Sequence, residues 1–119
     1  MSLLVQVFIR DKSEQLTILD AESSGENLAG FENCRKTVYG GDTAKSLGLV
    51  LLPLLREQDI YVEGADLDVL QSDSGIILQN IELFAQESKL ETTYIRKRVE
   101  NIIDTITHAK KVGGGVVIW

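Results

Sequence analysis

A column of acidic residues and a histidine is the first arrangement in this sequence that could do chemistry. Glu100, Asp104 and His108 follow one another at intervals of four, so in a helix they would stack on one side. Two carboxylates and an imidazole could bind a divalent transition metal. At about 100° per residue, however, the column points away from the apolar residues of the same segment. We therefore expect a solvated helix face, and we predict no metal site and no cofactor.

Two glycine-rich stretches can be compared with phosphate-binding loops. Residues 113–115 are all glycine, but they follow a predicted helix and precede a strand, which reverses the order that a phosphate loop needs. Gly40 and Gly41 have the better order, because a helix is predicted to follow them. Asp42 would repel an anion there, and no lysine stands where nucleotide-binding loops have one. We favour a helix stop at 113–115 and a helix start near Asp42.

The residues around the single cysteine form another candidate group. Cys34 is followed by Arg35, and a neighbouring cation could lower the pKa of the thiol. The only histidine lies on the outward face of another predicted helix, so a buried, unreactive Cys34 is favoured. The polar side chains that would bind a ligand or a partner, if the fold brings them together, are Glu32, Arg35, Tyr39 and Asp42.

Composition and charge argue against several classes of function. The chain has 119 residues and a net charge of −6, from 18 acidic and 12 basic side chains. Nucleic-acid binders need clustered lysine and arginine, and the one dense basic group, at 96–98, has acidic neighbours. We therefore expect no nucleic-acid partner. An acidic surface suits attraction to a basic protein instead.

Cysteine usage and hydropathy indicate the compartment. One cysteine allows no internal disulfide and suits a reducing environment. The longest apolar run, at 47–55, is too short to cross a bilayer, which needs roughly 20 residues. The N-terminus lacks the charged start of a signal peptide. We expect a cytoplasmic protein that does not bind a membrane.

Strands are predicted near both ends of the sequence. Residues 3–9 and 16–19 are rich in β-branched and aromatic side chains and flank a polar turn, which predicts a β-hairpin. Residues 116–119 read as a final apolar strand, which should pair with the hairpin because its backbone groups need partners. Trp119 should pack on this sheet, and an exposed anchor is the alternative.

An apolar helix is expected in the middle of the molecule. Asp42 or Thr43 should cap its start, and it should end near residues 56–58. Its apolar side chains cover nearly the whole circumference, which predicts burial among other elements. Pro53 should kink or split it.

Three segments connect these elements. Residues 22–27 have the composition of a loop. Residues 31–39 are expected to form a short helix or an irregular segment. Residues 60–62 should be a short extended piece.

Two long helices should follow, at about 66–88 and 92–111, and the short turn between them predicts an antiparallel helical hairpin. The first helix carries a second apolar row besides its core-facing stripe. Each member of this row comes seven residues after the last: Val69, Ile76, Leu83 and Leu90. Such a row indicates either burial on two sides or a contact between copies of the chain. A break at 72–75, with Asp73 or Ser74 capping a new helix, is the alternative to one continuous helix.

Two segments resemble small uncharacterised bacterial proteins of this length. The first, residues 31–40, has the pattern Phe-Glu-x-x-Arg-x-x-Val-Tyr-Gly and is followed by the apolar helix. The second is the tail at 113–119, Gly-Gly-Gly-Val-Val-Ile-Trp. The resemblance covers most of the chain. It implies a bacterial, cytoplasmic setting and attaches no activity, cofactor or partner.

These patterns predict an α+β fold in a single domain, residues 1–119. A small antiparallel sheet, made of the N-terminal hairpin and the C-terminal strand, should pack against about three helices. The leading functional hypothesis is a non-catalytic protein-binding module, for instance an immunity-type protein that masks a basic toxin. The alternatives are a small-ligand-binding protein or enzyme with a pocket between sheet and helices, and a structural homo-oligomer.

Overall fold

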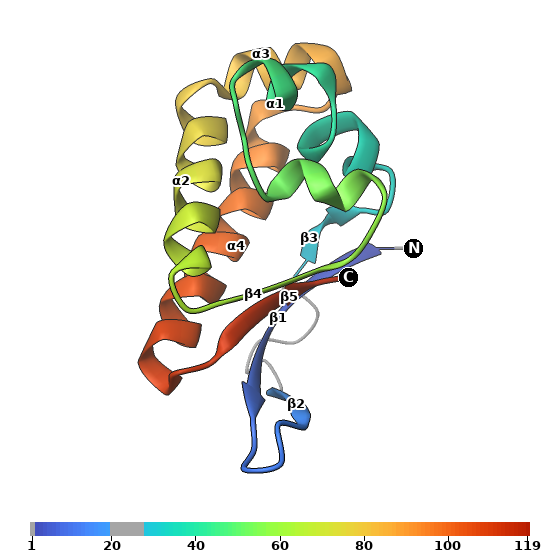
Figure 1. The fold of residues 1–119 in the computed structure, drawn as a ribbon. Helices are drawn as coiled ribbons and strands as arrows, with labels where there is room; N and C mark the ends of the chain where they lie inside the picture. Colours follow the sequence, from blue (N-terminus) through green and yellow to red (C-terminus); the bar gives the residue numbers. More distant parts are fainter. Residues whose placement is uncertain (1, 20–27) are drawn as a thin grey trace.

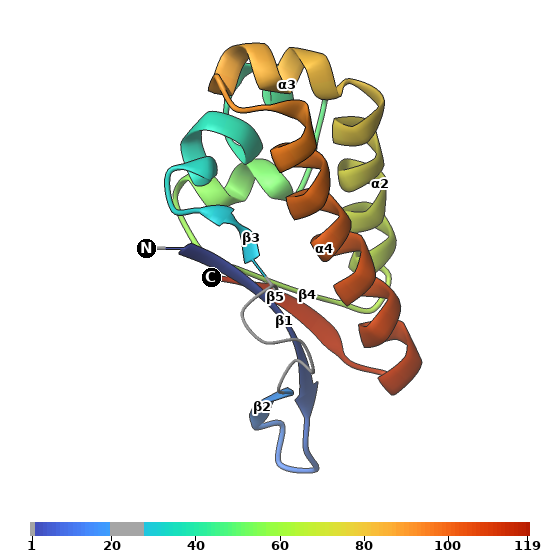
Figure 2. The same ribbon diagram turned by 180° about the vertical axis from the view of Figure 1, so that it is seen from behind.

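The computed structural model describes residues 2–19 and 28–119 as a sheet with helices on one side (Figures 1 and 2). The strands within these residues are β1 (Ser2–Arg10), β2 (Leu16–Leu19), β3 (Leu28–Phe31), β4 (Ile60–Glu63) and β5 (Gly115–Ile118). The α-helices are α1 (Asp42–Ser46), α2 (Asp66–Gln79), α3 (Ile81–Ser88) and α4 (Thr92–Val112). A π-helix, η1 (Arg35–Tyr39), and a 3-10 helix, η2 (Leu52–Arg56), complete the set. The predicted α+β fold is confirmed.

The sheet is built around β1. β5 pairs with it antiparallel, and so do β2 and β3, which meet opposite ends of β1. β4 pairs with the other edge of β5, which gives the order β2–β1–β5–β4. The predicted hairpin and the pairing of the C-terminal strand with it are therefore confirmed. The predicted extended piece at 60–62 is strand β4 of the same sheet.

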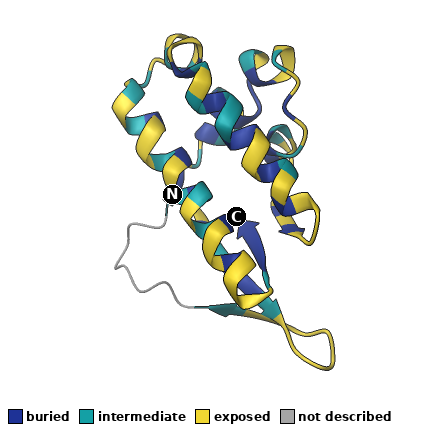
Figure 3. Cartoon of the chain, turned by 90° about the vertical axis from the view of Figure 1, so that its left-hand side faces the viewer, coloured by how far each residue is buried: buried dark blue, intermediate teal, exposed yellow. Residues whose placement is uncertain are grey.

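The hydrophobic core lies between this sheet and the helices. Strand register places Val7 beside Val116 and Val116 beside Val62, so these three side chains share one face. α4 packs against that face through its apolar stripe of Ile95, Val99, Ile102, Ile106 and Ala109. Figure 3 shows β5 buried along its length, while the outward sides of the helices are exposed. The predicted stripe of the last helix is thus its core face.

The prediction of one central, all-round buried helix is wrong. α1 ends at Ser46, and the chain then turns through Gly48, which has a left-handed φ of +81°. Pro53 lies in the first turn of η2, where its missing N–H costs little, so it helps to start a helix instead of kinking one. The segment also has a wet side, because Val50 and Leu54 are 61% and 44% exposed. The buried residues recur every three positions, as a 3-10 helix requires: Leu49, Leu52 and Leu55.

The long helix after β4 is divided, but not at 72–75. Asn80 ends α2, and its side-chain Nδ2 donates to the Ile76 carbonyl at 2.9 Å, a local bond that competes with continued helix. α3 starts at the next residue. Asp73 stays inside α2 and caps nothing in its own helix. α2 and α4 run antiparallel side by side, as predicted for the helical hairpin (Figures 1 and 2).

The segment at 31–39 combines the end of a strand with a helix. Phe31 closes β3, which the sequence did not indicate, and η1 follows after a turn. The Gly40 N–H donates to the Arg35 carbonyl at 2.9 Å, the five-residue step of a π-helix. The predicted loop at 22–27 lies outside the described residues.

Candidate functional site

Arg35, a predicted binding residue, joins η1 to the segment between η2 and β4. Its Nε donates to Glu32 at 2.5 Å, and its Nη2 donates to Asp59 at 2.5 Å. Its Nη1 donates to the carbonyls of Leu55 and Gln58 at 3.1 and 2.8 Å. The guanidinium is thus held by acceptors of the chain itself. Glu32 and Arg35 do come together, but as part of an internal clamp.

Tyr39 and Asp42 lie apart from this clamp. Tyr39 is 1% exposed, and its hydroxyl donates to the Ala29 carbonyl of β3 at 2.6 Å. Burial raises the pKa of this hydroxyl far above its ordinary value. Asp42 is exposed at the start of α1. The predicted group of four therefore divides into a clamp, a buried anchor and a surface carboxylate.

A shallow surface depression of about 440 Å³ lies at the junction of α2 and α3. None of the four predicted binding residues lines it. Its lining consists of Gln79, Asn80, Ile81, Glu82, Leu83 and Gln86. The four predicted residues therefore do not form this depression.

The start of α1, considered above as an anion site, already holds a carboxylate of the chain. Glu87 of α3 accepts the backbone N–H groups of Asp42 and Thr43 at 2.8 and 2.9 Å. A Cβ at Gly41 would meet that carboxylate, so a larger residue there would displace the Glu87 side chain from its present position. The predicted caps, Asp42 and Thr43, are wrong, because neither side chain caps the helix. Glu87 supplies the cap from another helix.

Glu87→Ala is expected to lower the free energy of unfolding by about 1 kcal/mol, as for the loss of a helix cap. Burial opposes ionisation, but the hydrogen bonds from Thr43 and Asp42 outweigh it and lower the pKa of Glu87. A carboxylate with a lowered folded-state pKa stabilises the fold above its unfolded pKa, and this contribution disappears as pH falls through the folded value. Urea unfolding from pH 7 to pH 3 should show the variant and wild type converging. Glu82→Ala, which removes an exposed carboxylate from the same helix, is the control variant.

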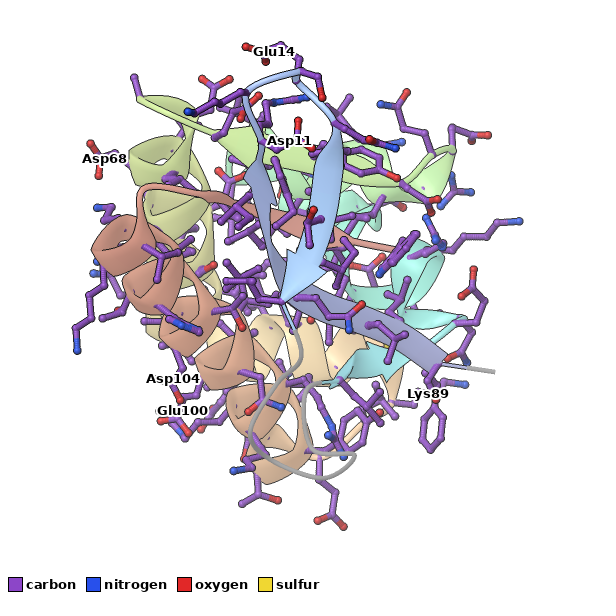
Figure 4. All side chains as sticks on the ribbon, turned by 90° about the horizontal axis from the view of Figure 1, so that it is seen from below. Asp11, Glu14, Asp68, Lys89, Glu100 and Asp104 are labelled. Atoms are coloured by element: carbon purple, nitrogen blue, oxygen red, sulfur yellow. The ribbon has the colours of Figure 1, made fainter. Side chains whose placement is uncertain are left out.

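The acidic and histidine column of α4 faces solvent, as predicted from the helical wheel. Glu100, Asp104 and His108 are all exposed, and Figure 4 shows the first two projecting from the helix. Within residues 2–19 and 28–119, no cluster of three or more His, Cys, Asp or Glu side chains could hold a metal ion. Cys34 is buried, as expected, and burial raises the pKa of its thiol despite opposing hydrogen bonds and the nearby Arg98.

The seven-residue row is spread over different elements. Val69 and Ile76 lie on α2, Leu83 lies on α3, and Leu90 lies in the turn before α4. Ile76 and Leu90 pack against the core, whereas Leu83 is 48% exposed. The row is therefore not one continuous exposed stripe.

The face of the sheet turned away from the helices carries an apolar surface that sequence reasoning missed. Phe8 and Val117 are fully buried there without belonging to the core under the helices. Tyr61 on the neighbouring β4 is 50% exposed and meets Phe8 edge to face, with ring centroids 6.0 Å apart. Trp119 is 38% exposed, and its Nε1 donates to the Gln6 side chain at 2.9 Å. We call this side of the sheet, where Leu4, Tyr61 and Trp119 are exposed and Phe8 and Val117 are buried, the sheet face.

Ionic and steric details fix the sheet face in place. Arg10 lies over the Phe8 ring, 5.6 Å from its centroid, and pairs with Glu63 of β4 at 2.9 Å. Gly115 of β5 makes room for the ring, because a Cβ there would lie 2.5 Å from Phe8 Cζ. The Phe8 ring is therefore held in a defined position.

Part of this surface could have been found in the sequence. In a strand, alternate residues point to opposite faces, so Phe8 must lie opposite Val7 and needs cover of its own. Tyr61 and Trp119 are 58 residues apart in the sequence and come together only because β4 and β5 are neighbours. Trp119 bonds to Gln6 of β1, as expected for packing on the sheet, and the anchor role stays a prediction.

Comparisons with protein-family models, with curated proteins and with solved structures found no match for this chain. Among the described residues, no helix is long and apolar enough to cross a membrane.

Proposed function

We propose that this chain is a non-catalytic protein-binding module and that the sheet face is its interface. The observation that supports this most strongly is the exposure of Tyr61 and Trp119 over the buried Phe8 and Val117, on the side of the sheet without helices. Tryptophan, tyrosine and arginine are the residues most enriched among those that dominate binding energy at protein interfaces. Here Arg10 lies over the Phe8 ring, which Tyr61 meets edge to face.

The charge around β4 favours a basic partner. Residues 57–68 include no lysine or arginine, and their acidic members are Glu57, Asp59, Glu63, Asp66 and Asp68. All but Asp66 have an ion-pair partner among the described residues, so it is the net charge of −6 that would speed the approach of a basic protein. An immunity-type protein that covers a basic toxin is one concrete form of this function. We place it in a bacterial cytoplasm, supported by the resemblance of the two sequence segments and by the single buried cysteine.

The test compares capture by the wild type with capture by Tyr61→Ala/Trp119→Ala. Leu83→Ala is the matched control, because it removes an exposed apolar side chain from α3. Each tagged protein is exposed to lysate of the source organism, and bound proteins are quantified by mass spectrometry. We expect a basic protein that the wild type and the control retain and that the double variant loses by about tenfold or more. Thermal unfolding of all three confirms that the variants are folded.

A second variant tests the charge argument without touching the sheet. Glu57→Lys/Asp66→Lys should slow association with the captured partner, and it should weaken the dependence of the association rate on salt. Surface plasmon resonance at several ionic strengths measures both. Equal capture of the partner by every variant would contradict the proposal that the sheet face is the interface. A small molecule released from the purified chain with no protein bound, or self-association alone in a mass measurement, would contradict protein binding itself.

A further inference from the structure

A second surface, away from the sheet face, is formed where α4 passes β3. Phe31, at the end of β3, is 56% exposed and stacks on Tyr94 of α4, with ring centroids 5.7 Å apart and planes within 10°. Tyr94 is held in place, because its hydroxyl accepts the Phe31 backbone N–H at 3.1 Å. Asn101, two turns further along α4, donates to the Leu28 carbonyl at 3.0 Å and fixes the helix to the same strand. The stacked pair is thus preorganised.

Arg98 lies on the Tyr94 ring of this pair, and within the described part of the chain neither it nor Arg96 has a carboxylate partner. Its Cζ is 4.9 Å from the centroid of the Tyr94 ring. Arg10, Arg35 and Arg56 each have a carboxylate oxygen within 4.0 Å, but within the described part of the chain Arg98 has none. Its Nε is buried and donates no hydrogen bond.

The arrangement has a specific chemical consequence. A guanidinium over an aromatic ring keeps its edge free for a planar acceptor, and a carboxylate matches that edge with two parallel hydrogen bonds. Because Nε itself is closed off from solvent, an arriving carboxylate would pair with the edge formed by Nη1 and Nη2. The exposed Phe31 ring offers an apolar contact beside it. Two neighbouring cations on the first turns of α4, Arg96 and Lys97, add attraction for an anion.

We propose that Phe31, Tyr94 and Arg98 form a binding site for a peptide carboxylate that has an apolar residue next to it. The carboxylate belongs either to an acidic side chain or to a chain end, and both present the same planar acceptor. This site is on different elements from the sheet face, and its test needs no cellular partner. Its failure would leave the proposed function standing, and the reverse also holds.

The experiment is a titration of the ¹⁵N-labelled full chain with short peptides, followed by NMR. Acetyl-Phe-Asp-amide offers a side-chain carboxylate, acetyl-Phe with a free end offers a terminal one, and acetyl-Phe-Asn-amide is the neutral analogue. We expect either carboxylate peptide, at millimolar concentrations, to shift the Arg98 side-chain Nε–H signal and the amides of Phe31 and Tyr94. The stronger of the two identifies the source of the carboxylate. The neutral analogue should bind about tenfold more weakly or less.

Variants distinguish the effect of the two parallel hydrogen bonds of the Arg98 guanidinium from the effect of its positive charge. Arg98→Gln and Arg98→Lys should each weaken binding about tenfold, because lysine keeps the charge and loses the two-pronged geometry. Arg96→Gln is the matched control and should change affinity less than twofold. Phe31→Ala tests the site without altering any charge and should also weaken binding. Equal binding of the neutral analogue, equal loss in Arg96→Gln, or equal shifts with inorganic phosphate would overturn the proposal.

Discussion

Asp73→Ala is expected to destabilise the fold by about 3 kcal/mol, the largest effect of a single polar substitution in this chain. Asp73 is 2% exposed, and its carboxylate accepts three consecutive backbone N–H groups. Those groups belong to Val50, Leu51 and Leu52, at distances of 2.7 to 3.2 Å. Removing the carboxylate leaves these donors without their acceptor in the segment that replaces the expected central helix. Chemical denaturation at pH 7 measures the loss.

Two further measurements separate this role from a general effect of mutation. Asp68→Ala removes an exposed carboxylate from the same helix, where the pair with Lys110 is a surface contact, and it should cost less than about 1 kcal/mol. Hydrogen exchange of the amides of residues 50–52 should become much faster in Asp73→Asn, which keeps the shape of the side chain but only one accepting oxygen. Equal destabilisation by the two alanine variants would contradict this account.

Arg35→Met is expected to destabilise the fold by about 2 kcal/mol, because it removes the hydrogen bond to Glu32 and three hydrogen bonds that join η1 to residues 55–59. Burial opposes the charge, yet the bonds to Asp59 and Glu32 raise the pKa of Arg35 above its ordinary value. The side chain is 15% exposed, while both carboxylates are 45% exposed. Much of the loss should therefore come from the two carbonyls and from packing, since water can solvate the carboxylates.

Comparison with two other variants tests the clamp. Arg35→Lys should recover less than half of the loss, because one ammonium cannot reach all four acceptors. Arg10→Met breaks a more exposed pair and should cost clearly less than Arg35→Met. Thermal and urea unfolding measure all three. A smaller effect at Arg35 than at Arg10 would show that the clamp does not hold these segments together.

Local patterns in the sequence correctly predicted those helices and strands that are determined by residues close together in the chain. Alternation and β-branched residues predicted β1, β2 and β5, and helical periodicity together with Gly113, whose φ is +70°, predicted α4 and its end. The pairing of β5 with β1 followed from the need of a terminal apolar strand for partners. Each of these inferences depends on residues close together in the chain.

The errors came from interactions between distant residues. The central segment could be extended or helical by composition, and it follows an irregular path because Asp73, more than 20 positions away, binds its N–H groups. Capping of α1 by Glu87 from 44 residues away could not be read from local capping residues. Arg35 looked like a binding residue because its acceptors at 55–59 come beside it only in the folded chain.

The position of β5 also has a consequence for folding during synthesis. β5 lies between β1 and β4 in the sheet, yet the ribosome makes it after every other described element. Until residues 115–118 emerge, β1 has an unpaired edge and β4 has no strand beside it among the described elements. Such edges bind chaperones or other chains readily, and contacts between distant residues form slowly. We therefore expect the nascent chain to remain incompletely folded until residues 115–118 have left the ribosome, and its exposed strand edges to be most vulnerable to aggregation just before that moment.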